Sequence, residues 1–217
     1  MKFRFSFIDN EIEISNEFIK CIEVENNNYF IRMIINLNNY SNKDGNCDEL
    51  IIDENNCNLD LIIDYFNMIN NKKDIANIIK YIESKINEND HEKIKKLYNK
   101  IVDNLSNTIY ELNLPVNINP DYNINKILKL LNIFIENSDN ILQNILNYID
   151  INILIQNNIL IFINLKSYLS KNELLELYKY CIYNEVTIVL IDNRLYGTTL
   201  EYEKKLIIDC NLEEFTI

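Results

Sequence analysis

Residues 159–191 read ILIFINLKSYLSKNELLELYKYCIYNEVTIVLI, and this stretch decides the fold class. It begins with a continuous apolar run, typical of a strand that is buried on both faces of a sheet. Ser170 and Glu173 then form a capping box, which predicts a helix that runs to about Tyr183. A second apolar run, Val186 to Ile191, predicts another buried strand. Strand, helix and strand in this order imply a right-handed crossover between parallel strands, and therefore an α/β fold.

The N-terminal part of the chain also carries strand patterns. Alternating apolar residues on both sides of a turn at Asp9 and Asn10 predict a hairpin. A longer apolar run and an amphipathic segment then predict a strand followed by a helix. The expected strands are residues 3–7, 12–14, 19–24, 50–52 and 59–66, and the expected helix is 30–40.

The middle of the chain is helical in pattern. From Asp74 to Leu112 the apolar residues recur with a period of about 3.6 residues. We expect two long helices here, separated near residues 87–90 and packed as an antiparallel pair. Pro115 and Pro120 are expected to end the second helix, because proline lacks the amide hydrogen that a helix interior needs. A short helix over 124–131, a strand over 133–135 and a helix over 141–148 are expected next.

These patterns predict two domains. Both ends of the chain, residues 1–71 and 151–217, are expected to form an α/β head with a central mixed sheet. Residues 72–150 are expected to form an inserted α-helical leg domain.

The chain has only two glycines, Gly45 and Gly197, which are too few for a glycine-rich phosphate loop. Such a loop needs glycines so that backbone amides can close around phosphate oxygens, with a lysine reaching over them. The position where an ATPase carries this loop reads ENNN, at residues 25–28. The apolar run quoted above ends in Asn164, where such enzymes place a magnesium-binding aspartate. We therefore predict that the protein is not a nucleotide hydrolase or a nucleotide-cofactor enzyme.

The cysteines and the apolar segments indicate a soluble protein of the cytoplasm. Five cysteines, an odd number without a Cys-x-x-Cys pair, argue against a disulfide framework and a zinc knuckle. We expect reduced thiols, most of them buried as apolar side chains. No stretch resembles a signal peptide or is long enough to cross about 30 Å of hydrocarbon. The single histidine, His91, lies among polar residues and is expected to be solvated.

The net charge of −12 argues against a nucleic-acid partner, because affinity for phosphates depends on lysine and arginine displacing counterions. A nucleic-acid-binding protein with this balance must concentrate its positive charge on one surface. Lys93, Lys96 and Lys100 share one face of an expected helix and form the best basic stripe in the sequence.

Two other functions stay open at this point. A divergent metal-dependent nuclease could use Asp60, Asp64 or Asp121. Pro120 and Asp121 resemble the first half of a restriction-nuclease motif, but the nearby Glu-x-Lys at residues 83–85 precedes them, which is the wrong order. A protein-only scaffold would form a stable oligomer that is indifferent to DNA.

Four segments resemble, in the same order, parts of the CRISPR-associated type II-A adaptation protein, the Csn-two family. The four segments are the opening hairpin at 5–12, the helix at 30–40, residues 159–174, which are the longest, and the strand and turn at 189–196. An acidic segment at 208–215 follows them, as in that family. The resemblance covers essentially the whole chain. It implies an ATPase-like head without ATPase chemistry, together with a helical leg.

The resemblance also implies a function without catalysis. Members of the family form ring-shaped homotetramers that bind the ends of linear double-stranded DNA in a central channel. They assist spacer acquisition in antiviral defence, alongside the adaptation integrase and the type II effector nuclease. A channel focuses the electric field of the residues that line it. In such a ring the negative net charge of the chain therefore no longer argues against a nucleic-acid partner.

The site residues that this resemblance implies fall into two groups. Calcium ions near the junction of head and leg are assigned to Glu111, Asp121 and Glu136. Phosphate contacts to DNA are assigned to Lys126, Lys129, Lys166 and Lys171.

Overall fold

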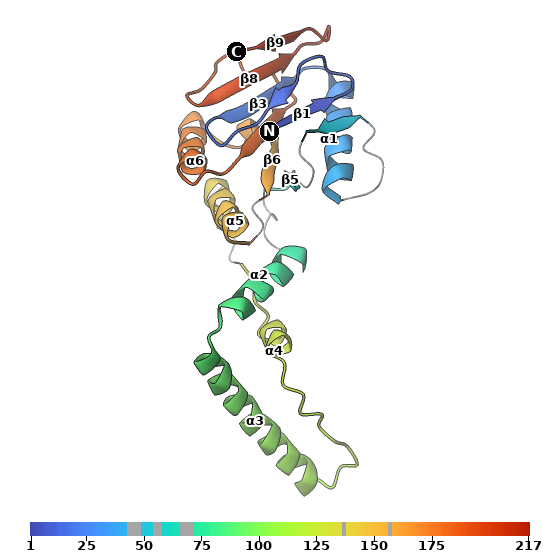
Figure 1. The fold of residues 1–217 in the computed structure, drawn as a ribbon, viewed down its shortest axis with the longest axis vertical. Coiled ribbons are helices and arrows are strands. Elements are labelled where there is room, and N and C mark those ends of the chain that lie inside the picture. Colours follow the sequence, from blue (N-terminus) through green and yellow to red (C-terminus); the bar gives the residue numbers. More distant parts are fainter. Residues whose placement is uncertain (43–48, 54–57, 66–71, 136–137, 156–157) are drawn as a thin grey trace. The chain divides into compact units, whose positions relative to one another are not determined.

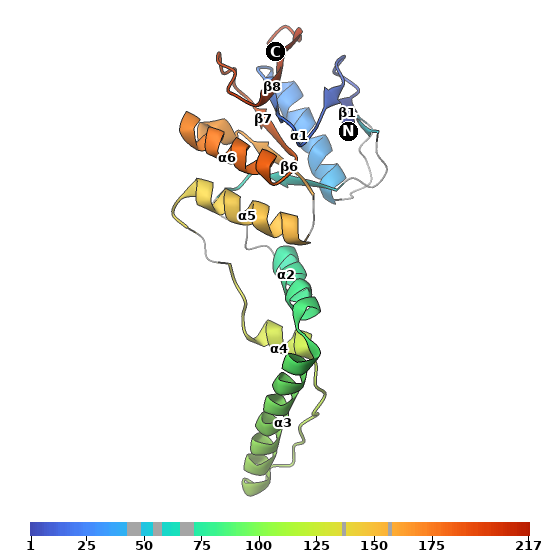
Figure 2. The same cartoon turned by 60° about the vertical axis from the view of Figure 1, so that its left-hand side comes forward.

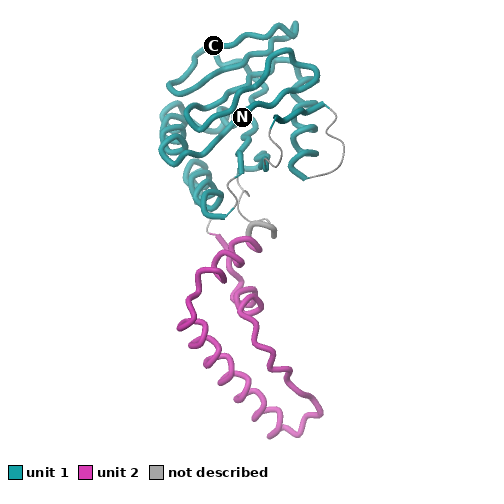
Figure 3. Tube along the Cα trace, in the orientation of Figure 1, with its two compact units in different colours: residues 1–69, 137–217 teal, residues 70–136 magenta. Residues whose placement is uncertain are grey.

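The computed structural model describes residues 1–42, 49–53, 58–65, 72–135, 138–155 and 158–217. The chain divides into two compact units (Figure 3), a head unit of residues 1–69 and 137–217 and a leg unit of residues 70–136. The leg therefore ends near 136 rather than at the predicted 150. The reason is α5 (Ile141–Ile155), which is fastened to the head by hydrogen bonds from Tyr148 to Asp60 and from Tyr180 to Asp150.

Six strands of the described chain form the main sheet of the head, in the order β5-β6-β7-β3-β8-β9 (Figure 1). Neighbours from β5 to β8 run parallel, and β9 is antiparallel to β8. β6 and β7, joined by α6 (Lys171–Tyr183), are the predicted parallel pair, and the predicted capping box of Ser170 and Glu173 is present. The strands are β3 (Ile19–Val24), β5 (Leu59–Ile62), β6 (Ile159–Ile163), β7 (Ile188–Asp192), β8 (Glu203–Ile208) and β9 (Glu214–Thr216).

A second, smaller sheet lies beside the main one. In the described residues it has three antiparallel strands in the order β2-β1-β4. β1 (Lys2–Phe5) and β2 (Ile12–Glu13) are the predicted hairpin, and β4 (Leu50–Ile52) pairs with β1. Phe3 and Phe5 are buried in one core with α1 (Asn27–Asn42) and the main sheet. Each buried side chain of this size contributes about 1.5–3 kcal/mol, so this shared core fastens the small sheet to the large one.

The two faces of the main sheet differ in chemistry. Figure 2 shows α1 on one side of the sheet and α6 on the other. Side chains alternate along a strand, so Ile22 and Val24 lie on the α1 side, while Cys21 and Glu23 lie on the α6 side. The α1 side is an apolar core, whereas the α6 side carries several buried charged residues.

The leg unit is built around a small core between α2 and α4, where Ile79, Ile124 and Leu128 are buried. The predicted antiparallel pair of long helices is wrong, because α3 leads away from α2 (Figure 1) and none of its described side chains is buried. Periodicity identifies the helices but not the surface that covers an apolar stripe. Residues 133–135, expected as a strand, have no regular secondary structure. The helices are α2 (Lys72–Lys85), α3 (Glu88–Glu111) and α4 (Ile124–Leu130).

Candidate functional site

The connection between β3 and α1 consists of two residues, Glu25 and Asn26. The side-chain oxygen of Asn26 accepts hydrogen bonds from the backbone amides of Asn28, at 3.0 Å, and Tyr29, at 3.3 Å. Free amides at the start of a helix can bind phosphate, but here a side chain caps them. Glu25 contributes a carboxylate rather than a lysine, and it accepts a hydrogen bond from the amide of Cys210. This short, capped connection has none of the groups of a phosphate loop.

Four charged residues are buried together on the α6 side of the main sheet. Glu23, Lys166, Glu203 and Lys205 form what we call the buried ion-pair network, and each is at most 9% exposed. The Lys166 Nζ atom lies 2.8 Å from Glu203 and 3.3 Å from Glu23. The Lys205 Nζ atom lies 2.8 Å from the same oxygen of Glu23. Two ammonium and two carboxylate groups balance, so the network needs no external counter-ion.

The network residues come from three parts of the fold. Glu23 lies near the end of β3, and Glu203 and Lys205 are two residues apart on β8, so they point to the same side. Lys166 comes from a short 3-10 helix, η1 (Leu165–Ser167), directly after β6. The chain turns into η1 at Asn164, whose left-handed backbone (φ 56°) is tolerated by asparagine better than by most residues.

Burial disfavours charge on Lys166 and Glu203, but the partners of these two residues outweigh burial. Burial lowers the pKa of Lys166, yet the acidic groups around it, including Glu203 and Glu23, raise that pKa above its ordinary value overall. Burial raises the pKa of Glu203, yet hydrogen bonds from Lys166 and from the amide of Leu200 hold it below its ordinary value. Tyr178 of α6 also donates to Glu203, at 2.8 Å. Lys166 and Glu203 are therefore a charged pair at neutral pH.

The same network holds the segment that follows β7. Glu23 accepts a hydrogen bond from the amide of Tyr196 at 2.8 Å. Lys205 donates to the carbonyl oxygens of Tyr196 and Thr198, at 2.8 and 3.2 Å. These charges are thus satisfied by the chain's own backbone and side chains, which indicates a structural role.

Asp192, the last residue of β7, is fully buried near the network. Neither of its carboxylate oxygens makes a hydrogen bond of normal geometry within the described structure. The pKa of Asp192 is raised to about 7, and burial is the largest cause. The charge of Lys166 lowers this pKa, whereas the charge of Glu23 raises it. An unpaired buried carboxylate is costly when ionised, so Asp192 is a group that titrates near neutral pH.

The four lysines predicted to contact DNA have two different environments. Lys126 and Lys129 on α4 and Lys171 in the first turn of α6 are exposed. Lys166 is 8% exposed, and two carboxylates hold its ammonium group. We therefore correct the assignment of Lys166, because its charge is already paired inside the head.

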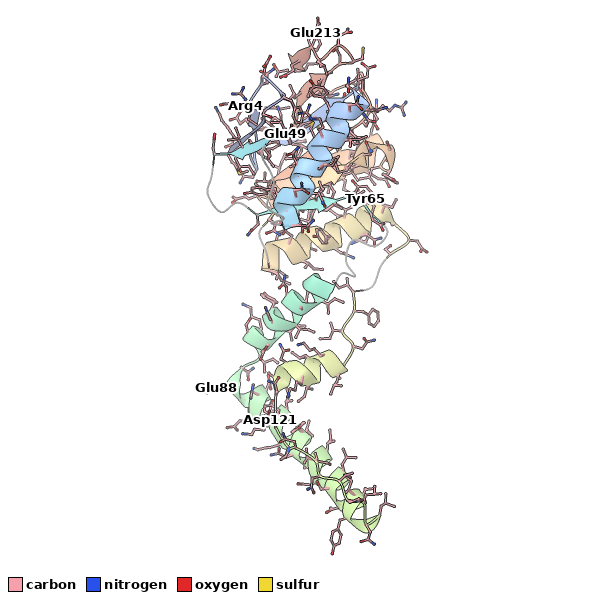
Figure 4. All side chains as sticks on the ribbon, turned by 90° about the vertical axis from the view of Figure 1, so that its right-hand side faces the viewer. Arg4, Glu49, Tyr65, Glu88, Asp121 and Glu213 are labelled. Carbon is pink, nitrogen blue, oxygen red and sulfur yellow. The ribbon has the colours of Figure 1, made fainter. Side chains whose placement is uncertain are left out.

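The acidic residues predicted to bind calcium do not form a shared site in the described structure. Glu111 ends α3, whereas the carbonyl oxygen of Asp121 accepts a hydrogen bond from Tyr98 at 3.3 Å. Asp121 accordingly lies beside the N-terminal half of α3 (Figure 4). At 1.5 Å per residue, Tyr98 and Glu111 are about 20 Å apart along the helix. Glu136 lies outside the described residues.

The aspartates of the nuclease alternative have different environments. Asp60 accepts the hydrogen bond from Tyr148, Asp64 is exposed beyond β5, and Asp121 lies in the leg unit, 3.9 Å from Lys126. Among the described residues, no three histidine, cysteine, aspartate or glutamate side chains are grouped closely enough to hold a metal ion.

The cysteines have different environments. Cys21 and Cys181 are buried thiols and Cys210 is exposed, while Cys47 and Cys57 fall outside the described ranges.

The sequence patterns missed most of the buried ion-pair network. Glu23, Glu203 and the neighbouring Asp192 were not singled out, because a charged residue usually marks a solvated position. Their signal was a charge inside or at the end of a largely apolar strand, as in IKCIEV at residues 19–24 and IVLID at residues 188–192. Such charges are buried only when partners are supplied from elsewhere in the fold.

Fold and site together define a class: an α/β protein with a largely parallel six-stranded sheet, in which charges buried beside the sheet are paired by the chain's own hydrogen bonds and ion pairs. Residues 43–212 match the family model described as CRISPR-associated protein (Cas_Csn2). The chain therefore belongs to this family of type II-A CRISPR-associated proteins.

The fold of the chain is similar to that of a solved structure. The crystal structure of Stu0660 of Streptococcus thermophilus matches it with a TM-score of 0.65 and 14% sequence identity, over 96% of this chain and 75% of that one. At this identity the likeness concerns the fold. None of the curated proteins compared with the chain is similar to it. No helix in the described ranges is both long and apolar enough to span a bilayer.

Proposed function

We propose that this protein binds the ends of linear double-stranded DNA as a homotetrameric ring and assists CRISPR spacer acquisition without catalysing a reaction. The observation that carries the proposal is the family match over residues 43–212. The two-residue connection after β3 and the internally paired charges of the head support a scaffold role for the sheet.

Exposed lysines support a DNA-binding surface. Lys126 and Lys129 are three residues apart on α4, so they lie on the same exposed side of that helix, away from buried Ile124 and Leu128. The Lys126 ammonium has only a distant partner, Asp121 at 3.9 Å, and both side chains are about 70% exposed, so this pair is weak. Lys171 on α6 is the third proposed contact. Phosphate groups would bind these lysines mainly by counterion release, independently of sequence.

An exposed apolar stripe on α3 supports assembly into an oligomer. Leu97, Ile101 and Leu105 are four residues apart, share one helix face and are 60%, 58% and 52% exposed. Contiguous apolar surface of this kind is typical of protein–protein contacts. We assign it to contacts between copies of the chain in the ring.

Partners and calcium enter this proposal through the family resemblance. The proposed protein partners are the adaptation integrase and the type II effector nuclease. Calcium is proposed to support the ring, but Glu111 and Asp121 lie too far apart to bind one ion together. Glu111 and Asp121 are therefore not proposed as ligands of one shared calcium ion.

The test compares a short linear duplex with the same duplex closed at both ends by hairpin loops, by gel shift, with and without calcium. The proposal predicts tighter binding of the open duplex in at least one condition, and equal binding of the two in both conditions would overturn it. The same samples, incubated with magnesium or manganese and run on a denaturing gel, test the nuclease alternative. Cleavage that is lost in Asp60→Asn would contradict the non-catalytic proposal, whereas an oligomer without DNA binding would indicate a protein-only scaffold.

A further inference from the structure

Lys20 is a buried lysine without an ion-pair partner among the described residues. It lies in the middle of the main sheet, on β3, and the residue is only 7% exposed. By strand alternation it lies on the α1 side together with Ile22 and Val24, which belong to the apolar core. Within the described part of the chain, its ammonium group makes no hydrogen bond and no ion pair. A lysine so placed keeps its stem in the core and brings its charge to the surface.

A second lysine lies directly beside Lys20. In the parallel register of β3 and β8, Lys20 is opposite Lys204, so both side chains lie on the same side of the sheet. Adjacent strands are about 4.8 Å apart, which brings two positive charges close together. Lys204 is exposed, and its Nζ atom lies 3.7 Å from the centre of the Phe18 ring.

This pair has an excess of positive charge in a chain whose net charge is −12. Burial lowers the pKa of Lys20, and the charge of Lys204 lowers it further, while Glu13 acts in the opposite direction. Glu13 nevertheless forms no ion pair with either lysine in the described structure. Two close ammonium groups without a carboxylate between them are stabilised by an anion that accepts hydrogen bonds from both.

We propose that Lys20 and Lys204 form a binding site for a phosphate group on the β3–β8 part of the head. A phosphate carries up to two negative charges and several acceptor oxygens, which match two ammonium groups with three donors each. Phe18 provides an apolar wall on one side of this site. Free phosphate compounds and nucleic-acid backbones both carry this group, and the test below distinguishes the two sources. The site uses other residues than the lysines proposed to contact DNA on α4 and α6, and it does not depend on the proposed binding of DNA ends.

The test measures the free energy of unfolding by urea at several concentrations of inorganic phosphate, with chloride keeping the ionic strength constant. A ligand that binds the folded chain stabilises it in a saturable way, which gives an apparent dissociation constant. The variants are Lys20→Met and Lys204→Met, and the control is Lys179→Met, an exposed lysine on α6. Lys204→Met keeps the test valid if Lys20→Met perturbs folding, because Lys204 is exposed.

We expect the wild type and Lys179→Met to share one dissociation constant, and both Lys20→Met and Lys204→Met to weaken it by about fivefold or more. The same dependence on phosphate in all four proteins would overturn the proposal, since it would reflect only the general effect of this salt. Titration with duplex DNA distinguishes the two sources. Weaker DNA binding by Lys20→Met assigns the site to backbone phosphate, and unchanged DNA binding with lost phosphate binding assigns it to a free phosphate compound.

Discussion

The Nζ atom of Lys166 lies 2.8 Å from a carboxylate oxygen of Glu203, in the interior of the head unit. In open α/β sheets, ligands bind beyond the carboxyl ends of the strands, where the residue after a strand such as β6 is well placed to meet them. Here that region supplies Lys166, which pairs with residues of β3 and β8 instead. The four charges of the buried ion-pair network are partnered internally, and we expect DNA to contact the exposed lysines.

Removing Lys166 should therefore affect stability. Lys166→Met leaves Glu203 without its cation in a buried site, and breaking such a pair typically costs about 3–5 kcal/mol of unfolding free energy. Lys171→Met, at an exposed position, should change that free energy by less than about 0.5 kcal/mol. Urea unfolding followed by circular dichroism measures both. If Lys166→Met were as stable as the wild type but bound DNA less tightly, our correction of its role would be wrong.

Asp192 should make the stability of the head depend on pH. Its pKa in the folded chain is about 7, above the value of about 3.9 for an unfolded aspartate. Unfolding therefore releases a proton between these values, and the free energy of unfolding falls as pH rises through this window. Asp192→Asn should remove this component, with its largest gain in stability above pH 7. Urea unfolding at several pH values tests this, and equal pH dependence in both proteins would contradict it.

Exposed lysines should set the salt dependence of DNA binding. Each phosphate contact contributes about 0.9 to the slope of log affinity against log salt concentration. Replacing Lys126, Lys129 and Lys171 with glutamine should lower this slope by as much as about 3 and weaken binding at low salt. Fluorescence anisotropy measures the slope, with Lys179→Gln as the control. An unchanged slope in the triple variant would place the contacts elsewhere.

The apolar stripe of α3 should control assembly. Ile101→Glu puts a charge in the middle of that stripe, where the side chain is 58% exposed, so the fold of the single chain should be preserved. Asn99→Glu adds the same charge on the opposite side of α3, at another exposed position. Light scattering should show a smaller assembly for Ile101→Glu and the wild-type mass for Asn99→Glu. The wild-type mass in both variants would exclude this stripe from the interface.

The sequence predicted those parts of the fold whose strands and helices are each marked by a pattern within one short stretch of residues. β6, α6 and β7 follow one another with two apolar runs and a capping box at Ser170, so their order fixes a parallel crossover. β8 was missed, because the burial of Glu203 and Lys205 breaks the expected alternation of apolar and polar residues. These two charges are buried only because Lys166 and Glu23 come from other parts of the chain.

The leg illustrates a second limit of sequence patterns. The apolar positions of α3 have a helical period, and they predicted a packed partner helix. In the structure Leu97, Ile101 and Leu105 remain exposed, while α2 packs against α4. A periodic stripe shows that a face is apolar, but a partner within the chain and a partner in an oligomer give the same pattern.

The most direct test of DNA-end binding uses one closed circular duplex, measured before and after a single enzymatic cut. Cutting creates two ends and changes neither the sequence nor the number of phosphates. We predict that the cut form competes at least about tenfold better than the closed circle for the protein in a gel-shift assay, a difference of about 1.4 kcal/mol. Equal competition by the two forms would contradict the account.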